Sequence, residues 1–365
     1  MGRTLTSDLL KRAAFRLIYL SLLVRTVTIM RKFFVLFCAL LIAGFGKAQD
    51  PHFSQFFASP LTLNPAFTGK FDGSWRLAAN HRDQWPSIPK AYVTSSASVD
   101  FPILAKRIPE FDVFGVGLSG VTDASANSQL KLNYGSASLS YHKALDENGY
   151  NTIGAGFQGT YNSMILDVSK LTFEDMLRQN GFTGQTNDVP GLFQGDNKRN
   201  YFDVNAGILF SGSTNGENNY YIGTSMYHIN RPKVSYTDKT WYLSGRITVH
   251  GGGSFPVSDV VTVNTSVIHQ IQNKASETIV GAALGLNANG DLNNPTSVYI
   301  GSWMRFNDAI IPYVGLEFGG LRIGASYDVN VSSLKAATGN RGGSEISLIY
   351  IKRPADYKGI PCPRF

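Results

Sequence analysis

The sequence predicts an all-β membrane protein: an antiparallel up-and-down β-barrel of about 14 strands, preceded by a short N-terminal segment in its lumen or at its periplasmic mouth. Three observations support this class. Segments of about ten residues in which apolar and polar residues alternate recur between residues 74 and 353. No apolar run after Gly46 approaches the roughly 20 residues of a membrane helix. An export signal precedes the alternating segments.

Residues 1–48 are expected to form a leader. Within it, residues 30–48 have the pattern of a signal peptide: a basic start, an apolar core, and small residues at positions −3 and −1 of a cut before Gln49. Because Met30 opens this pattern, residues 1–29 are expected to result from a start site assigned too far upstream. The mature chain is therefore expected to be exported.

The formal charge of +7 is concentrated in the leader. Residues 1–48 hold eight Lys and Arg and one acid, and the rest of the chain holds 25 residues of each sign. A neutral mature chain makes nucleic acid an unsuitable partner. After the leader only Cys362 remains, so no internal disulfide is expected.

Residues 49–73 form an N-terminal segment rich in aromatic residues and proline. Prolines at positions 51, 60 and 65 prevent a regular helix or strand. The apolar side chains that need cover are Phe53, Phe56, Phe57, Leu61, Leu63 and Phe67. We expect this segment to pack into the lumen or the periplasmic mouth; docking on a partner is the alternative.

Residues 74–353 are expected to form the barrel. The predicted strands are 74–83, 90–101, 112–121, 130–143, 151–163, 201–212, 219–228, 241–255, 260–271, 277–287, 297–306, 310–318, 321–331 and 344–352. In the clearest of them, Ile323, Ala325 and Tyr327 alternate with Arg322, Gly324 and Ser326. A soluble sandwich would also show this alternation, but the strand lengths and the export signal favour a barrel in the outer membrane.

Loop lengths predict the orientation of the barrel. If the N-terminus is periplasmic, the odd-numbered connections face the outside of the cell, where outer-membrane barrels carry their long loops. The long connections 164–200, 229–240 and 332–343 all have odd numbers, and 164–200 includes an expected short helix at 171–178. An even number of strands returns the tail, residues 354–365, to the periplasm.

The sequence shows no motif of an enzyme or of a cofactor site. GVGLSG (115–120) satisfies the dinucleotide pattern G-x-G-x-x-G, but no helix pattern follows it, so glycines on the lumenal face of a strand are the better interpretation. The six histidines lack metal-ligand spacing, and no G-x-S-x-G elbow is present. We therefore expect no catalytic, cofactor-binding or metal-binding residues.

Several stretches resemble the PorP/SprF family of type IX secretion outer-membrane proteins of Bacteroidetes. The resembling stretches are DPHFSQFFASPLTLNPAFTG (50–69), HRDQWPSIPKAY (81–92), YFDVNAGILF (201–210), GGSEISLIYIKR (342–353) and CPRF (362–365). The resemblance spans almost the whole mature chain. It implies a non-enzymatic outer-membrane barrel that supports export or surface attachment of a large cell-surface protein such as a gliding adhesin.

The resemblance also implies the partners: outer-membrane lipid, other type IX secretion components in the periplasm and outer membrane, and a large adhesin-like substrate. The alternative function is an outer-membrane transporter or channel for a small solute, with hydrophobic solutes among the candidates. The candidate partner-binding residues are Phe53, Phe56, Phe57, Asn64, Pro65, Phe173, Phe182, Phe193, Cys362, Arg364 and Phe365.

Overall fold

The computed structural model describes residues 50–88, 91–184, 186, 197–234, 241–289 and 296–353. The expected signal peptide, residues 30–48, and the expected tail, residues 354–365, lie outside the described residues. In the part of the chain that the structure describes, no helix is long and apolar enough to cross a membrane.

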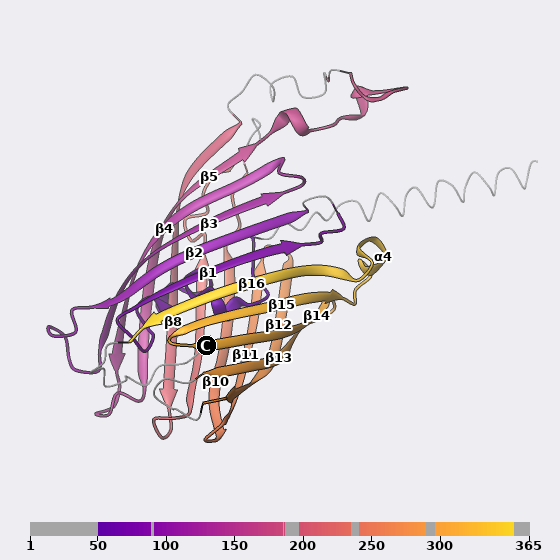
Figure 1. Ribbon diagram of the computed structural model, residues 1–365. Helices are drawn as coiled ribbons and strands as arrows, with labels where there is room; N and C mark the ends of the chain where they lie inside the picture. The colour runs from indigo at the N-terminus through magenta and orange to yellow at the C-terminus, as the bar shows by residue number, and fades with distance from the viewer. Residues whose placement is uncertain are drawn as a thin grey trace, which may run out of the picture. The chain divides into compact units, whose positions relative to one another are not determined.

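Fourteen antiparallel strands close into a barrel, which confirms the predicted fold class (Figure 1). Neighbours in sequence pair with one another around the barrel, and β1 pairs with β16 to close it. The strands are β1 (Trp75–Gln84), β2 (Tyr92–Ile103), β3 (Val113–Ser125), β4 (Leu130–Ala144), β5 (Thr152–Leu166), β8 (Lys198–Ser213), β9 (Asn219–Tyr227), β10 (Arg246–Ser258), β11 (Val261–Gln272), β12 (Ala275–Asn287), β13 (Ser297–Arg305), β14 (Ala309–Phe318), β15 (Leu321–Asn330) and β16 (Arg341–Lys352).

The closing pair β1–β16 is continuous over the whole length of β1. Its register runs from Trp75 opposite Lys352 to Gln84 opposite Gly343 without a break. Closure matters because a membrane interior offers no water to hydrogen-bond the backbone groups of an open sheet edge. The continuous pairing therefore leaves neither β1 nor β16 with an open edge along the length of β1.

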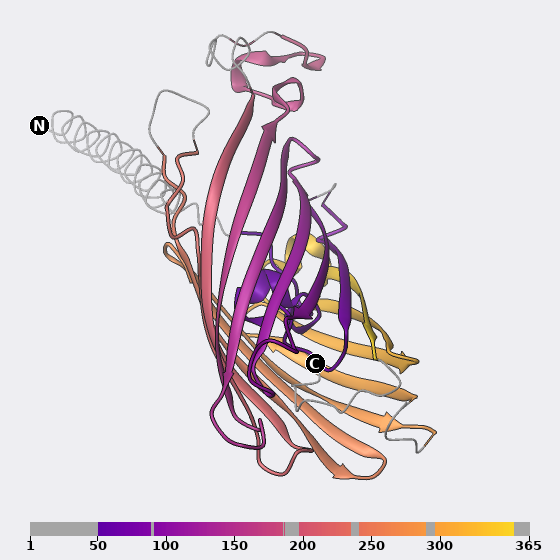
Figure 2. The ribbon, with the colours of Figure 1, turned by 90° about the vertical axis from the view of Figure 1, so that its left-hand side faces the viewer.

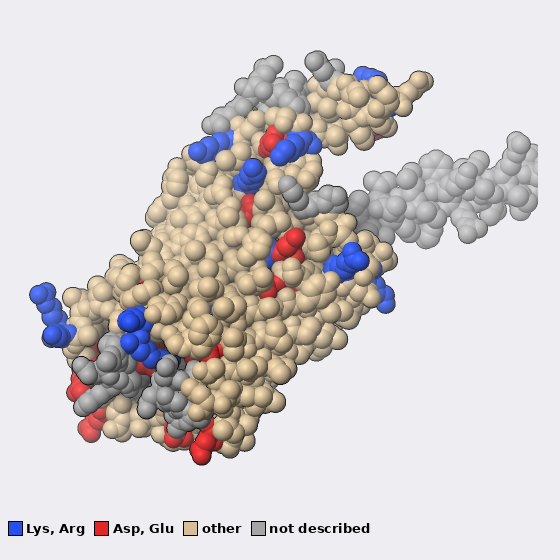
Figure 3. Space-filling view, in the orientation of Figure 1, with Lys and Arg blue, Asp and Glu red and all other residues tan. Residues whose placement is uncertain are grey.

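Alternate side chains face outward and into the lumen, as the sequence predicts. On β15, Ile323 and Tyr327 are each 40% exposed, whereas Ser326 and Asp328 are buried in the lumen. On β4, Leu139 and Tyr141 point outward opposite the buried Ser138 and Ser140. The face in Figure 3 carries its charged side chains mainly toward the ends of the strands, with largely uncharged surface between them, as a lipid-facing wall requires.

The two ends of the barrel differ. The end where β1 begins and β16 ends, here called the turn end, carries the short turns 259–260 and 319–320. The opposite end, here called the loop end, carries the two longest connections, 167–197 and 228–245. Figure 2 shows several strands of the first half of the chain rising past the other strands toward the loop end.

Elements outside the barrel are short. They are 3₁₀-helices η1 (Phe56–Ala58), η2 (Pro65–Phe67), η3 (Val168–Lys170) and η4 (Glu174–Met176), helices α2 (Pro60–Leu63) and α4 (Lys335–Thr338), and the two-residue strands β6 (Leu177–Arg178) and β7 (Gly181–Phe182). The predicted helix at 171–178 is wrong: only Glu174–Met176 form a helical turn, and β6 then pairs with β7 as a small hairpin. Gly181, at φ +104°, allows this reversal.

We expect removal of β16 to abolish the barrel, because β1 and β15 would each be left with an unpaired edge in hydrocarbon. Truncation before Gly342 should yield no species with heat-modifiable migration on SDS gels. Removal of residues 362–365 alone is the control and should leave that migration intact. A folded, heat-modifiable barrel from the longer truncation would contradict the closure seen here.

Candidate functional site

The N-terminal segment, which the structure describes from Asp50 and which leads through Ser74 into β1, crosses the lumen from the loop end to the turn end. At its start, the Asp50 amide donates to Gln272 Oε1 at 2.7 Å, and Gln272 ends β11 at the loop end. At its other end, Ser74 donates its amide to the carbonyl of Lys352, the last residue of β16. Figure 2 shows the short helices of this segment inside the barrel.

Prolines determine the broken course of the segment. Pro60 and Pro65 each stand at the first position of a helix, where the missing N–H costs no hydrogen bond, and the resulting helices α2 and η2 are four and three residues long. Asn64 separates them and caps η2, since its side chain accepts the Ala66 amide at 2.8 Å. Several backbone carbonyls of the segment find partners on the wall, for example that of Leu63, which accepts from the Ser225 hydroxyl.

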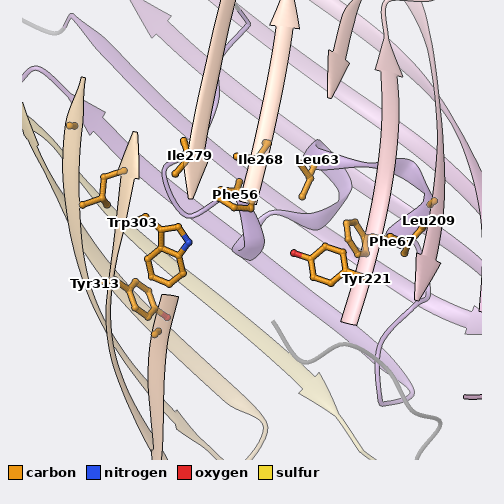
Figure 4. Close-up of a cluster of buried hydrophobic side chains, with 13 residues drawn as sticks. Phe56, Leu63, Phe67, Leu209, Tyr221, Ile268, Ile279, Trp303 and Tyr313 are labelled. Atoms are coloured by element: carbon orange, nitrogen blue, oxygen red, sulfur yellow. The ribbon is translucent and has the colours of Figure 1, made fainter. Parts of the chain in front are cut away.

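Apolar side chains of the segment form the core of the lumen (Figure 4). Phe56, Leu63 and Phe67 pack with wall residues that include Leu209, Tyr221, Ile268, Ile279, Trp303 and Tyr313. The Phe57 ring lies 4.8 Å from that of Trp303 and edge-on to Tyr313 at 5.6 Å. Burying a large aromatic side chain contributes about 1.5–3 kcal/mol, so these contacts hold the segment in place.

Glycines of the wall let the segment approach its backbone. A Cβ atom at Gly115 would overlap the carbonyl of Thr68, and one at Gly207 would overlap the side-chain oxygen of Asn64. Gly115 opens the GVGLSG stretch, so the lumenal-glycine interpretation of that motif agrees with the structure. The glycines make room for the segment.

Asn64 joins the segment to three strands. Its side-chain nitrogen lies 3.1 Å from the Ile208 carbonyl, 3.2 Å from that of Thr224 and 2.9 Å from His250 Nε2. The residue is fully buried. A buried amide with this many partners fixes the position of the segment along the lumen more precisely than apolar packing does.

Buried charges surround the segment at the loop-end side of the lumen. Arg305 and Arg82 each lie within 2.9 Å of the Asp328 carboxylate. Ser54 joins this cluster through its amide, which donates to Glu345 at 2.7 Å, and its hydroxyl, which donates to Asp328 at 2.9 Å. All four charged side chains are at most 4% exposed. Buried ion pairs of this kind need further hydrogen bonds, and the segment supplies some of them.

A second polar cluster holds the first residue of the segment. The imidazole of His228 donates from Nε2 to Asp50 and from Nδ1 to Asp203, each at 2.7 Å, so its geometry is that of a protonated ring. Burial by itself lowers the pKa of His228, but the charge of Asp50 and hydrogen bonds to both carboxylates raise it overall to about 9. For Asp50, burial acts to raise the pKa, and the charges of His228 and Arg246 outweigh it and hold the pKa below its usual range.

A third contact fixes the segment near the turn end. Arg76 of β1 forms a two-pronged ion pair with Asp100 of β2, with nitrogen–oxygen distances of 3.0 and 2.8 Å. The same guanidinium donates to the Phe67 carbonyl, and Asp100 accepts the Gly69 amide at 2.7 Å. The pair is therefore shared between the wall and the segment.

The structure separates the predicted partner-binding residues into three groups. Those of the N-terminal segment lie in the lumen: Phe53, Phe56, Asn64 and Pro65 are buried, and Phe57 is partly buried. This is the lumenal packing that the sequence analysis favours. In the loop-end connection, Phe182 is 51% exposed and Phe173 is half-buried. Phe193, Cys362, Arg364 and Phe365 lie outside the described residues.

Sequence reasoning missed the polar residues that hold the segment. They are Asp50, Ser54, Arg76, Arg82, Asp100, Asp203, His228, Arg305, Asp328 and Glu345. A signal for several of them was present, because Arg82, Asp100, Asp203, Asp328 and Glu345 stand at inward positions of predicted strands. Charges at such positions require partners in the lumen.

We expect the attachment of the segment's first residues to weaken at high pH. A group whose pKa is raised by folding stabilises the structure fully below its unfolded pKa of about 6.5, and that stabilisation disappears as the pH rises through its folded value. For His228 the loss should occur between neutral pH and about pH 9. Hydrogen exchange of the amides of residue 50 and residues 52–55, compared with a His228→Gln variant at each pH, is the measurement.

At pH 7 these amides should exchange on the order of ten times faster in the variant, and at pH 10 the two proteins should exchange at similar rates. Comparison at equal pH cancels the intrinsic pH dependence of exchange. The same ratio at both pH values would show that a charged His228 does not hold Asp50.

The comparisons with known proteins begin with solved structures. The toluene transporter TbuX of Ralstonia pickettii is 11% identical, with 85% of this chain and 96% of TbuX covered and a TM-score of 0.43. The CymD monoaromatic hydrocarbon channel is 10% identical, with the same coverages and a TM-score of 0.45. The P. putida toluene transporter TodX is 11% identical, with 80% and 94% covered and a TM-score of 0.42.

No curated protein matches the sequence. One family model does, that of the type IX secretion system membrane protein PorP/SprF, over residues 45–350. The match covers all of the N-terminal segment and nearly the whole barrel. The same family model therefore includes both the segment and the wall that encloses it. The chain therefore belongs to the PorP/SprF family of type IX secretion system membrane proteins, and it is an outer-membrane β-barrel.

Proposed function

We propose that this barrel is a non-enzymatic component of the type IX secretion system that supports export or surface attachment of one large cell-surface protein, such as a gliding adhesin. The observation that carries the proposal is the lumen filled by the chain's own N-terminal segment, in a member of a secretion family. Such a barrel provides a fixed surface at the membrane. The energy for export must come from other components.

The lumenal histidines support a structural role. His228 lies between Asp50 and Asp203, His142 Nε2 is 2.7 Å from the Ala66 carbonyl, and His250 contacts Asn64. Each therefore binds the N-terminal segment. Within the described residues, no group of three or more His, Cys, Asp or Glu side chains is placed to hold a metal ion.

The two ends of the barrel provide separate surfaces for partners. We place periplasmic secretion components at the turn end and the exported protein at the loop end, in keeping with the orientation that the loop lengths predict. At the loop end, the lobe formed by η3, η4, β6 and β7 exposes Leu177 by 53% and Phe182 by 51%. Exposed apolar side chains on a long loop are suited to contact a partner.

The transporter alternative depends on whether a solute can pass the segment. TbuX and TodX are named as toluene transporters, and a barrel of this width can conduct when its lumen is open. Here the segment buries Leu61, Asn64, Ala66 and Phe67 completely or almost completely against the wall. The contacts of the segment therefore favour a role in attachment over one in transport.

The loop end should face the outside of the cell. An epitope tag inserted near Gly184, in the lobe of the longest connection, should be labelled on intact cells, because the odd-numbered connections are expected to be extracellular. A tag in the turn 319–320 is the matched control and should be labelled only after lysis. The reverse pattern would invert the orientation and exchange the partners assigned to the two ends.

Deletion of the gene should remove one large protein from the cell surface while other type IX substrates remain there. This selectivity is expected because an accessory barrel supplies position and contact rather than driving force. Comparison of the surface proteomes of wild-type and deletion strains is the measurement, with complementation by the intact gene as the control. An unchanged surface proteome together with impaired growth on one nutrient would favour transport instead.

A further inference from the structure

Among the strands that the structure describes, none pairs with one edge of β8 over its loop-end part. On its other side β8 pairs with β5 without interruption from Ser211 to Lys198. β9, however, pairs with β8 only from Ser213 to Ala206. Over residues 198–205, β8 therefore continues past the end of β9, and among the described residues no further strand pairs with this edge.

The side chain of Asn230 takes the place of a strand at the start of this edge. Its Oδ1 accepts the Val204 amide at 3.1 Å, and its Nδ2 donates to the Phe202 carbonyl at 2.8 Å. Ile229 donates its amide to the Val204 carbonyl at 3.0 Å. Because backbone groups alternate in direction along an antiparallel strand, Asn200 also presents its N–H and C=O on this side.

The backbone groups of Asn200 on this edge have no partner within the described part of the chain. The Phe202 amide is the next N–H on this edge after that of Asn200. It lies between Asn200 and the groups that Asn230 caps, which are the Phe202 carbonyl and the Val204 amide. A strand edge with unpaired backbone groups, as at Asn200 here, is a template for an added strand, which can form main-chain hydrogen bonds whatever its side chains are. The cap by Asn230 marks where such a strand would begin.

A pocket lies on the inner face of the same part of β8. It is lined by Tyr201, Asp203 and Asn205 of β8 and, on the neighbouring elements, by Tyr134, Asn162 and Arg246, among others. Four residues of the N-terminal segment form the floor of the pocket: Asp50, Pro51, Leu61 and Thr62.

Two buried polar atoms in this pocket lack partners within the described residues. Asn162 is 3% exposed and its Nδ2 donates no hydrogen bond; Asp203 is 1% exposed and its Oδ1 accepts none. Leaving a buried polar group unpaired costs about 1–3 kcal/mol, so a ligand that pairs with both atoms would recover that cost. A side-chain or peptide amide carries the required acceptor and donor together.

We propose that the loop-end edge of β8 binds an extended polypeptide segment of the exported protein as an added strand, with one long side chain reaching into the pocket between Asn162 and Asp203. This inference rests on the proposed function and specifies where the exported protein is held. Residues opposite Tyr201 and Asp203 on an added strand would lie about 5 Å from them, over the pocket.

The charge around the edge indicates the character of this segment. Lys198, Arg199 and Arg231 lie on the edge or next to its cap, and Lys198 and Arg231 are exposed. Along residues 198–205 the only acid is Asp203, which points inward and is buried. An acidic segment would therefore be favoured, with its outward side chains near the basic residues.

The test uses three variants of the full chain in its own cells, and the probe is the surface protein that is lost from the deletion strain. Asn200→Pro removes the outward N–H and blocks an added strand, while the hydrogen bonds to β5, made by residues 199, 201 and 203, remain. Asn200→Ala keeps the backbone N–H. Asn162→Leu removes the amide in the pocket and leaves the wall packed. Heat-modifiable migration on gels checks that each variant is folded.

We expect the surface amount of the probe protein to fall about tenfold in Asn200→Pro and in Asn162→Leu, and to stay near the wild-type amount in Asn200→Ala. In addition, the amides of residues 200 and 202 should exchange more slowly in barrels isolated with the probe protein than in barrels isolated without it. Both results would support strand addition.

A folded Asn200→Pro barrel that retains the probe protein at the wild-type amount would overturn the inference. Loss in Asn162→Leu alone would also overturn it, because binding would then depend on the pocket without an added strand. The proposed function fails by a different result, which is a deletion strain that loses no surface protein. The two failures are therefore distinguishable.

Discussion

The pairing of β1 with β16 is the contact on which the rest of the structure depends. It satisfies the backbone of both terminal strands and turns a sheet into a closed wall, which is the condition for crossing hydrocarbon with strands. Closure has a second consequence, because it creates a lumen whose inner side chains face neither lipid nor bulk water. The inward positions of this barrel carry Arg76, Arg82, Asp100, Arg305 and Asp328, and these need partners within the lumen.

The N-terminal segment supplies many of those partners, so segment and wall specify one another. Ser54 bonds to Asp328 and Glu345, and Gly69 bonds to the Asp100 carboxylate that also holds Arg76. The buried pairs of Asp328 with Arg82 and Arg305, and that of Asp100 with Arg76, thus receive hydrogen bonds from the segment. Breaking a buried ion pair by removing one partner costs about 3–5 kcal/mol. For this reason the segment is part of the barrel's interior rather than a removable plug held by apolar contacts alone.

The fold could be predicted from the sequence because its signal is local. A period of two residues fixes which side chains of β15 face lipid, and Tyr327 and Asp328 lie on the expected faces. Strand ends were less predictable: β8 starts at Lys198 rather than at residue 201, and β10 starts at Arg246 rather than at residue 241. The pairing of the edge with Asn230 and the bridge between Lys233 and Tyr242 depend on tertiary contacts, which periodicity does not record.

The residues of the lumen were predictable only in part, because their contacts also depend on tertiary structure. The prolines and phenylalanines of residues 50–69 indicate a buried, irregular segment, but nothing in their order gives its direction. The structure shows that Asp50 lies among residues of the loop end and that the chain reaches the turn end only just before Trp75. The closed wall therefore encloses a segment that extends across the lumen.

The N-terminal segment also lines the loop-end pocket, so a shift of the segment would change the shape of the site where we place the exported protein. The closed wall opposes such a shift. The barrel thereby offers a preformed site, which lowers the entropic cost of binding.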